Sequence, residues 1–154
     1  MNGRAVVMGG VALFVMGRSA WSAEGNFEVQ MTPAEWRAKL GDLPYRVLRE
    51  EATERAFTSP LDKETRAGTY HCAGCDLAAF SSEHKYDSGT GWPSFWQPLQ
   101  NAVGTKADRS LFGTRTEVHC RRCGGHFGHV FDDGPQPTGK RYCMNGAALT
   151  FRTA

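Results

Sequence analysis

Cysteine is the residue type with the clearest chemistry in this 154-residue chain, and four of the five cysteines fall into two pairs. Each pair has the spacing Cys-x-x-Cys, a turn that brings two sulfurs together, and we call each turn a knuckle. The knuckles are Cys72/Cys75 and Cys120/Cys123. Four thiolates complete the tetrahedral ligand set of one structural zinc and leave no open position on the metal. Two disulfides are the alternative in an oxidising compartment, but disulfides of this spacing are typical of redox-active sites, so the sequence favours zinc.

The fifth cysteine stands alone in the segment Arg141-Tyr142-Cys143-Met144-Asn145. Residues two apart on a strand share a face, so Arg141 and Asn145 are expected beside the Cys143 thiol. Positive charge and donors favour the thiolate, which is the reactive form. A lone cysteine is more often a small buried apolar residue, but a dry core would not accept these two polar neighbours. Cys143 is therefore the candidate nucleophile.

Two histidines precede the lone cysteine in a Gly-His-Phe-Gly-His segment, and an aspartate follows in the next turn. Because the knuckles account for the metal, His126 and His129 are expected to serve as acid or proton-relay groups. Asp133 is expected to orient a histidine or a water. Metal binding by the histidines is less favoured, because the segment lacks the glutamate of a His-Glu-x-x-His helix and its glycines disfavour a helix.

An aromatic segment at 89–96 is the other dense group of informative residues. Glycines on both sides of Trp92 favour a loop that presents the indole ring to a ligand. The alternative is that Trp92, Phe95 and Trp96 all fill the core. We expect a division in which Phe95 is buried and Trp92 lies at a pocket.

Two short helices are predicted ahead of these residues. Thr32, Pro33 and Glu35 form a capping box with proline at the first helical position, and Gly41 is predicted to end this helix. A second helix is predicted at 45–51.

Short extended segments between turns follow from Gly68 onward, after a polar loop at 52–68. Frequent glycine, 18 residues in all, suits a turn-rich, mainly β domain. We therefore predict one domain with an antiparallel β core and small N-terminal helices. The candidate strands are Thr69–Cys72, Arg115–Cys120, His126–Phe131, Tyr142–Met144 and Ala148–Phe151.

The first 22 residues have the pattern of a secretory signal. An early arginine precedes an apolar stretch at 5–16, and the small residues Ala20 and Ser22 follow before the expected cut. The apolar stretch is too short for a transmembrane helix, so no stable membrane insertion is expected. The alternative is a mis-assigned start or a disordered extension. We expect 1–22 to be a signal peptide and 23–154 an exported, periplasmic domain; without export the protein would be cytoplasmic.

The charge balance excludes a nucleic-acid-binding surface. The 18 basic and 16 acidic residues give a net charge of +2, and the leader holds two arginines and no acid, so the mature chain has 16 of each. No long run of like charge occurs. We expect a monomer that acts on a small or peptide-borne group.

Five segments occur in the order found in a known family, and the similarity extends from about Met31 to Phe151. The chain resembles the methionine-R-sulfoxide reductases of the B type, which act on one epimer of the sulfoxide. The segments are Cys72–Cys75, Ser88–Phe95, Arg115–Cys120, Gly128–Pro135 and Arg141–Asn145.

The resemblance implies a β-sandwich-like fold, called a β-tent, with zinc held by the two knuckles. It implies that the Cys143 thiolate attacks the sulfoxide sulfur, releases methionine and becomes a sulfenic acid. Trp92 would pack against the substrate's methyl group. The reductase would repair oxidised methionine in proteins and peptides and would also act on free methionine sulfoxide. The polar wall, which would lower the thiol pKa, hold water and protonate the oxygen, comprises His126, His129, Asp133, Arg141 and Asn145.

One departure from the family bears on the mechanism. Many members carry a resolving cysteine, in some at the position of Thr90, and here every cysteine besides Cys143 is assigned to zinc. We therefore expect no intramolecular resolving disulfide, and regeneration by a thioredoxin-like protein or a small thiol. Ala52 and Ala56, where the family often has glycine and proline, affect only the N-terminal loop. A non-catalytic zinc-stabilised β module with an aromatic ligand pocket is the alternative, in which Trp92 matters and Cys143 does not.

Overall fold

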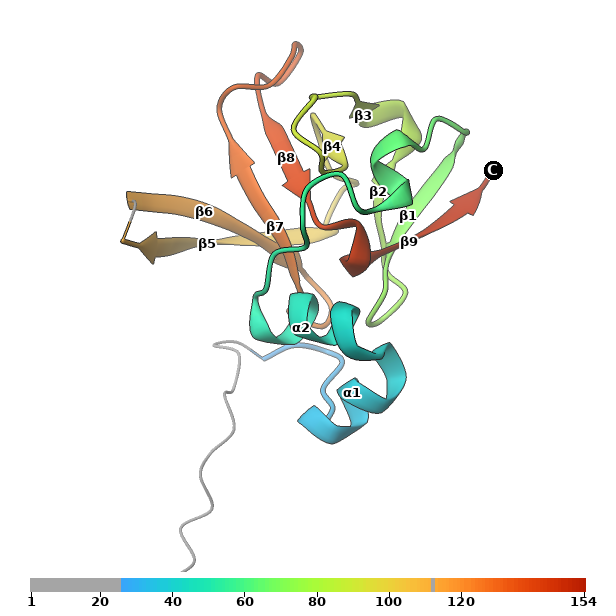
Figure 1. The fold of residues 1–154 in the computed structure, drawn as a ribbon, viewed down its shortest axis with the longest axis vertical. Helices are drawn as coiled ribbons and strands as arrows, with labels where there is room; N and C mark the ends of the chain where they lie inside the picture. The colour runs from blue at the N-terminus through green and yellow to red at the C-terminus, as the bar shows by residue number, and fades with distance from the viewer. Residues whose placement is uncertain (1–25, 112) are drawn as a thin grey trace, which may run out of the picture.

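The computed structural model describes residues 26–111 and 113–154, so the predicted leader at 1–22 lies outside the described residues. In these two described ranges, two antiparallel sheets form the body, with two short α-helices at one end (Figure 1). The mainly β prediction is confirmed. In chain order the elements are α1 (Pro33–Leu40), α2 (Asp42–Glu50), η1 (Pro60–Lys63), β1 (Gly68–Cys72), β2 (Ala78–Ser81), η2 (Ser82–His84), β3 (Lys85–Tyr86), β4 (Ser94–Phe95), β5 (Val103–Ser110), β6 (Gly113–Cys120), β7 (His126–Phe131), β8 (Arg141–Met144), η3 (Gly146–Ala148) and β9 (Leu149–Thr153), where η marks a 3-10 helix.

Helix α1 begins and ends as the sequence predicts. The Thr32 hydroxyl accepts a hydrogen bond from the Glu35 amide at 3.2 Å, and the Glu35 carboxylate accepts one from the Thr32 amide at 2.8 Å. The two bonds satisfy amide groups that have no partner within the helix. Gly41, with φ of 76°, ends the helix in a conformation that favours glycine.

Helix α2 starts earlier than predicted, which corrects the range 45–51 to 42–50. Pro44 therefore lies inside the first turn, where a missing amide donor costs nothing because that donor would have no helical partner. Gly41 serves both as the end of α1 and as the start of α2, so the two helices follow without a loop.

All five predicted strands are present, and four of them have one or both ends shifted by one or two residues. The strand at 126–131 has the predicted bounds, whereas 148 belongs to η3 and β9 begins at 149. The sequence did not predict β2, β3, β4 or β5. Strand β5 is largely polar and exposed along the sheet edge, so it lacks the alternation that identifies a half-buried strand.

The strand order places β8 inside the larger sheet. That sheet has the order β3-β4-β8-β7-β6-β5, and the smaller one has the order β2-β1-β9. Gly128 on β7 is required for this pairing, because a Cβ there would lie 2.1 Å from the Cys143 carbonyl oxygen on β8. The lone cysteine is thus held between two neighbouring strands.

Aromatic rings from both sheets form the core. Phe80 of the smaller sheet stacks on Phe95 of the larger one, with ring centroids 4.4 Å apart. Tyr70 meets Phe95 edge-on at 5.0 Å, and Phe80 meets Phe127 at 6.1 Å. Each fully buried ring stabilises the fold by roughly 1.5–3 kcal/mol relative to an exposed one. The sandwich-like arrangement follows from this shared aromatic layer.

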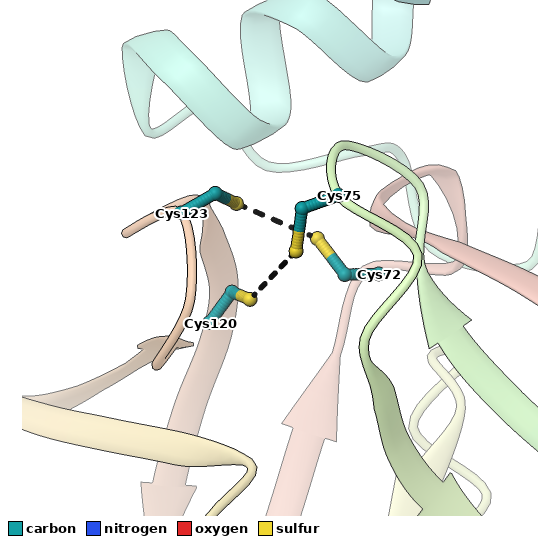
Figure 2. Close-up of side chains that lie close together, drawn as sticks. All are labelled: Cys72, Cys75, Cys120 and Cys123. Atoms are coloured by element: carbon teal, nitrogen blue, oxygen red, sulfur yellow. Dashed lines mark hydrogen bonds between the residues drawn. The ribbon is translucent and has the colours of Figure 1, made fainter. Parts of the chain in front are cut away.

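The helices cover the knuckle end of the sandwich. The Arg49 guanidinium lies 4.7 Å from the Trp36 ring and donates a hydrogen bond to the Cys123 carbonyl at 2.9 Å. These contacts fix α1 and α2 against the second knuckle, and Figure 2 shows helical ribbon beside the knuckle cysteines. Among the described residues no helix is long and apolar enough to cross a membrane.

Candidate active site and metal centre

The lone cysteine lies in one row of side chains that crosses the larger sheet. Cys143 on β8 is opposite Ser94 on β4 and opposite His129 on β7. Directly opposed residues in antiparallel strands project from the same face. The register therefore brings the predicted nucleophile and a predicted histidine together. The complete row is Tyr86, Ser94, Cys143, His129, Glu117 and Lys106.

A pocket of about 300 Å³ opens above this row. It includes four of the six residues predicted from the sequence to act on substrate through polar groups or sulfur, and also the predicted aromatic contact. Asp133 and His126 are absent from the lining. The lining residues are Thr53, Thr90, Trp92, Arg115, Gly128, His129, Phe131, Arg141, Cys143, Met144 and Asn145.

Arg141 is held in the pocket by two contacts. Its guanidinium donates to both carboxylate oxygens of Asp133, at 2.9 and 3.0 Å, and lies 4.4 Å from the centroid of the Phe131 ring. A two-point pair of this kind fixes the plane of the guanidinium. Asp133 itself is mostly exposed, so it acts on the pocket through Arg141.

Burial makes the net shift of the Cys143 thiol pKa upward; within the polar wall Arg141 lowers this pKa, as the sequence predicts, but Asp133 raises it. Burial raises the pKa of the Cys143 thiol above its usual value, because a thiolate is poorly solvated there. The charge of Arg141 and hydrogen bonds from Thr90 and Arg141 lower the pKa, but they do not outweigh burial. The thiol is therefore mainly protonated at neutral pH in the substrate-free pocket.

His129 lines the pocket, and a hydrogen bond to Asp108 fixes its ring. Its Nε2 lies 2.7 Å from a carboxylate oxygen of Asp108 on β5. Burial lowers the pKa of His129 below the usual histidine value, although the Asp108 hydrogen bond opposes this shift. At neutral pH the ring is thus uncharged. Its Nε2 carries the proton and donates it in the hydrogen bond to Asp108, which leaves Nδ1 as the free acceptor.

His126 lies behind His129, with ring centroids 5.4 Å apart. It is 3% exposed, and its Nδ1 bonds a carboxylate oxygen of Glu117 at 2.9 Å. Burial opposes ionisation of Glu117, yet hydrogen bonds from His119 and His126 hold the Glu117 pKa at about 2. The ionised carboxylate fixes the proton on Nδ1 of His126, whose Nε2 has no partner within the described residues.

Asn145 and Trp92 are both fixed by hydrogen bonds to the protein. The Asn145 amide nitrogen donates to the Phe127 carbonyl at 2.9 Å, and its oxygen accepts from the Glu54 amide at 2.9 Å. The Trp92 indole donates to the Glu54 carbonyl at 3.0 Å. Phe95 is fully buried while Trp92 is half-buried at the pocket, which confirms the predicted division.

Several residues that shape the site were missed by sequence reasoning. Asp108 lies on the unpredicted strand β5, and Glu54 lies in the segment predicted as a loop. Arg115 and Glu117 had a usable signal, because residues two apart on the predicted strand at 115–120 share a face. Nothing in the sequence placed that face toward the histidines.

The four knuckle sulfurs converge on one point (Figure 2), and all lie within 4.8 Å of one another. The Cys72 and Cys123 sulfurs are 3.7 Å apart, and those of Cys75 and Cys120 are 3.5 Å apart. A tetrahedron with zinc–sulfur bonds of about 2.3 Å has sulfur–sulfur edges of about 3.8 Å. Disulfides require about 2.05 Å, so the cluster fits a tetrahedral metal and the disulfide alternative does not fit.

The knuckles come from both sheets. Cys72 ends β1 of the smaller sheet and Cys120 ends β6 of the larger sheet, so each knuckle follows a strand as predicted. The Gly74 amide donates to the Cys72 sulfur at 3.3 Å, a contact that supports a thiolate. A metal at this point would join the two sheets at the end covered by the helices.

Comparison with known proteins agrees with the site. The SelR domain family matches residues 40–153. A protein named peptide methionine sulfoxide reductase MsrB from Leptospira interrogans is 51% identical over 128 residues, covering 82% of this chain and 98% of the relative. Two proteins of the same name are similar, one from Methylibium petroleiphilum (50% identity, 80% of this chain, 91% of the relative) and one from Bradyrhizobium diazoefficiens (54%, 75%, 84%). The chain therefore belongs to the SelR domain family, the family of the B-type peptide methionine sulfoxide reductases.

Proposed function

We propose that this chain, a methionine sulfoxide reductase by family, reduces the R epimer of methionine sulfoxide with Cys143 as the nucleophile. The family match supports the reaction. The observation that carries the role of Cys143 is its position in a pocket that also includes Arg141, His129 and Trp92. The substrate class is oxidised methionine in proteins or peptides, together with the free amino acid.

The first step transfers oxygen from the substrate to Cys143. The sulfur of Cys143 attacks the sulfoxide sulfur and forms a sulfur–sulfur bond. The sulfur–oxygen bond of the substrate then breaks, a new bond forms between that oxygen and the Cys143 sulfur, and the sulfur–sulfur bond breaks to leave a sulfenic acid on Cys143. The thiol loses one proton and the departing oxygen gains one. The Cys143 sulfur is oxidised by two electrons while the substrate sulfur is reduced by two, so the step needs no resident redox cofactor. The products are methionine and the Cys143 sulfenic acid.

His129 is suited to carry that proton. Its neutral ring faces the pocket from the strand position opposite Cys143, and Asp108 fixes its tautomer. In the proposal the free Nδ1 accepts the thiol proton and then donates it to the sulfoxide oxygen. Arg141, held by Asp133, stabilises the thiolate and the negative charge on the oxygen. His126 and Asn145 complete the polar wall by holding its other side chains in position.

Trp92 gives the pocket an apolar side. The sulfur of a methionine sulfoxide carries a polar oxygen and an apolar methyl group. These two substituents have opposite positions in the two epimers. A pocket that combines an indole ring with a polar wall binds these substituents differently, which supports selection of one epimer.

An external thiol restores the enzyme in this proposal. One thiol condenses with the Cys143 sulfenic acid to a mixed disulfide and water, and a second thiol reduces that disulfide to the free Cys143 thiol. Thr90, rather than a cysteine, lines the pocket next to Cys143. The reductant is a thioredoxin-like protein or a small thiol, and the enzyme acts as a monomer.

Substitution of the nucleophile tests the function. Cys143→Ser should abolish reduction of an R-sulfoxide substrate, because a serine hydroxyl does not form the sulfenic acid intermediate; turnover is measured by chromatography of the methionine product. Full activity in Cys143→Ser, with loss of substrate binding in Trp92→Ala, would instead favour a binding module without turnover.

Because no cysteine besides Cys143 is among the described residues that line the pocket, the Cys143 sulfenic acid should accumulate when no external thiol is present. When substrate is added without any reductant, mass spectrometry should find one oxygen added to the Cys143 peptide, trapped as a sulfenic acid adduct. A disulfide between Cys143 and a knuckle cysteine would contradict the proposed regeneration from outside.

Arg141 influences the pH range over which Cys143 ionises and becomes reactive. Because burial raises the Cys143 pKa and the Arg141 charge opposes this, Arg141→Met should shift thiolate formation to higher pH. Alkylation of Cys143 by iodoacetamide at pH 7 should slow by about tenfold, measured by mass spectrometry of the Cys143 peptide. Lys140→Met is the matched control, because it removes a neighbouring exposed charge. Equal alkylation rates for both variants would contradict the role of Arg141.

We further propose that the knuckles hold one structural zinc. Cys75→Ser should lose the metal and lower the melting temperature markedly, because structural zinc binding supplies about 10–16 kcal/mol in small zinc domains. Cys143→Ser is the control and should retain one zinc per chain by elemental analysis. Equal zinc content in both variants would exclude the knuckles as the site.

We also propose export of the chain, supported by the signal-like pattern at 1–22. Expression with the leader should give a periplasmic protein whose N-terminal sequence begins at Ala23. Recovery of the intact chain in the cytoplasm alone would contradict export.

A further inference from the structure

Glu54 is a buried acid that sequence reasoning assigned to a loop. It lies between α2 and η1 and is 3% exposed. An ionisable group is buried at a cost unless hydrogen bonds compensate it. Burial raises the pKa of the Glu54 carboxyl above its usual value, whereas hydrogen bonds from the Ala147 and Gly146 amides lower it.

The carboxylate of Glu54 attaches the segment to the end of the central strand. One carboxylate oxygen accepts a hydrogen bond from the Ala147 amide at 2.8 Å. Gly146 and Ala147 begin η3, the short helix that directly follows Asn145. The side chain thus anchors Glu54 to the backbone next to the polar wall.

The backbone of Glu54 binds one side chain on each side of the pocket. Its amide donates to the Asn145 side-chain oxygen at 2.9 Å, and its carbonyl accepts from the Trp92 indole at 3.0 Å. Asn145 follows β8, whereas Trp92 lies in the loop before β4. One residue therefore connects the polar wall and the aromatic contact.

We propose that Glu54 is a positioning residue that sets the spacing between the Trp92 ring and the polar wall. The inference rests on the proposed function, because this spacing determines where the methyl group and the oxygen of the sulfoxide lie. Glu54 is absent from the pocket lining and acts through the two side chains it binds. A displacement of about 1 Å in a site of this kind lowers turnover by about 100-fold.

Glu54→Gln tests the inference with little change in shape. Glutamine retains one oxygen for the Ala147 amide, but its amino group meets the Gly146 amide, so one anchoring bond is lost. The value of kcat/KM for an R-sulfoxide should fall by about 100-fold, mainly in kcat, and the preference for the R over the S epimer should decrease. The indole N–H resonance of Trp92, identified with Trp92→Phe, should shift in a proton–nitrogen correlation spectrum.

Glu50→Gln is the matched control. Glu50 is an exposed acid at the end of α2, 3.6 Å from Arg37, and its substitution changes the net charge equally. Kinetics, epimer preference and the Trp92 resonance should all match those of the unsubstituted protein.

Each other outcome overturns the inference. An unchanged Trp92 resonance with a lowered melting temperature assigns Glu54 a purely structural role, and a shifted resonance with unchanged kinetics shows that the spacing is not used. If Glu54→Gln does not fold, Glu54→Asp, which keeps the charge but shortens the side chain, should show the same pattern to a smaller extent, and normal epimer preference in it would overturn the inference. Failure of the unsubstituted protein to reduce either epimer would instead refute the proposed function, while the resonance still reports the contact.

Discussion

The register of β8 between β4 and β7 is the constraint on which the site depends. Side chains alternate between the faces of a strand, so a slip of one residue would turn Cys143 away from the pocket. Gly128 permits the correct pairing because it has no Cβ, which would clash with the Cys143 carbonyl oxygen. The pairing places Cys143 opposite His129. The chemistry of the proposed reaction follows from this one arrangement.

The polar groups around Cys143 are held in pairs rather than singly. Asp133 holds Arg141, Asp108 holds His129, and these carboxylates come from different parts of the chain. Each pair fixes an orientation or a tautomer, which reduces the reorganisation needed during reaction. Because burial keeps the Cys143 thiol protonated, the proton released on attack is available to the sulfoxide oxygen. The site is thus suited to moving one proton within the pocket.

The two ends of the sandwich have separate tasks. The knuckles bring sulfurs from both sheets to one point under the helices, a place suited to a structural metal. The pocket lies on the larger sheet and holds the one cysteine outside that cluster. This separation explains why Cys143 differs from the other four in its polar surroundings, and it leaves Cys143 without a cysteine partner among the residues that line its pocket.

The sequence by itself determined the knuckle pairs, the lone Cys143, the capped first helix and the strands that carry His126 and Cys143, because spacing and alternation are local signals. It did not reveal β5, whose polar edge lacks alternation, or the roles of Asp108 and Glu54. Their partners lie 21 and 91 residues away along the chain. Only the tertiary structure decided which carboxylate faces which histidine, and that burial raises the Cys143 pKa, since both depend on strand pairing across the sheet.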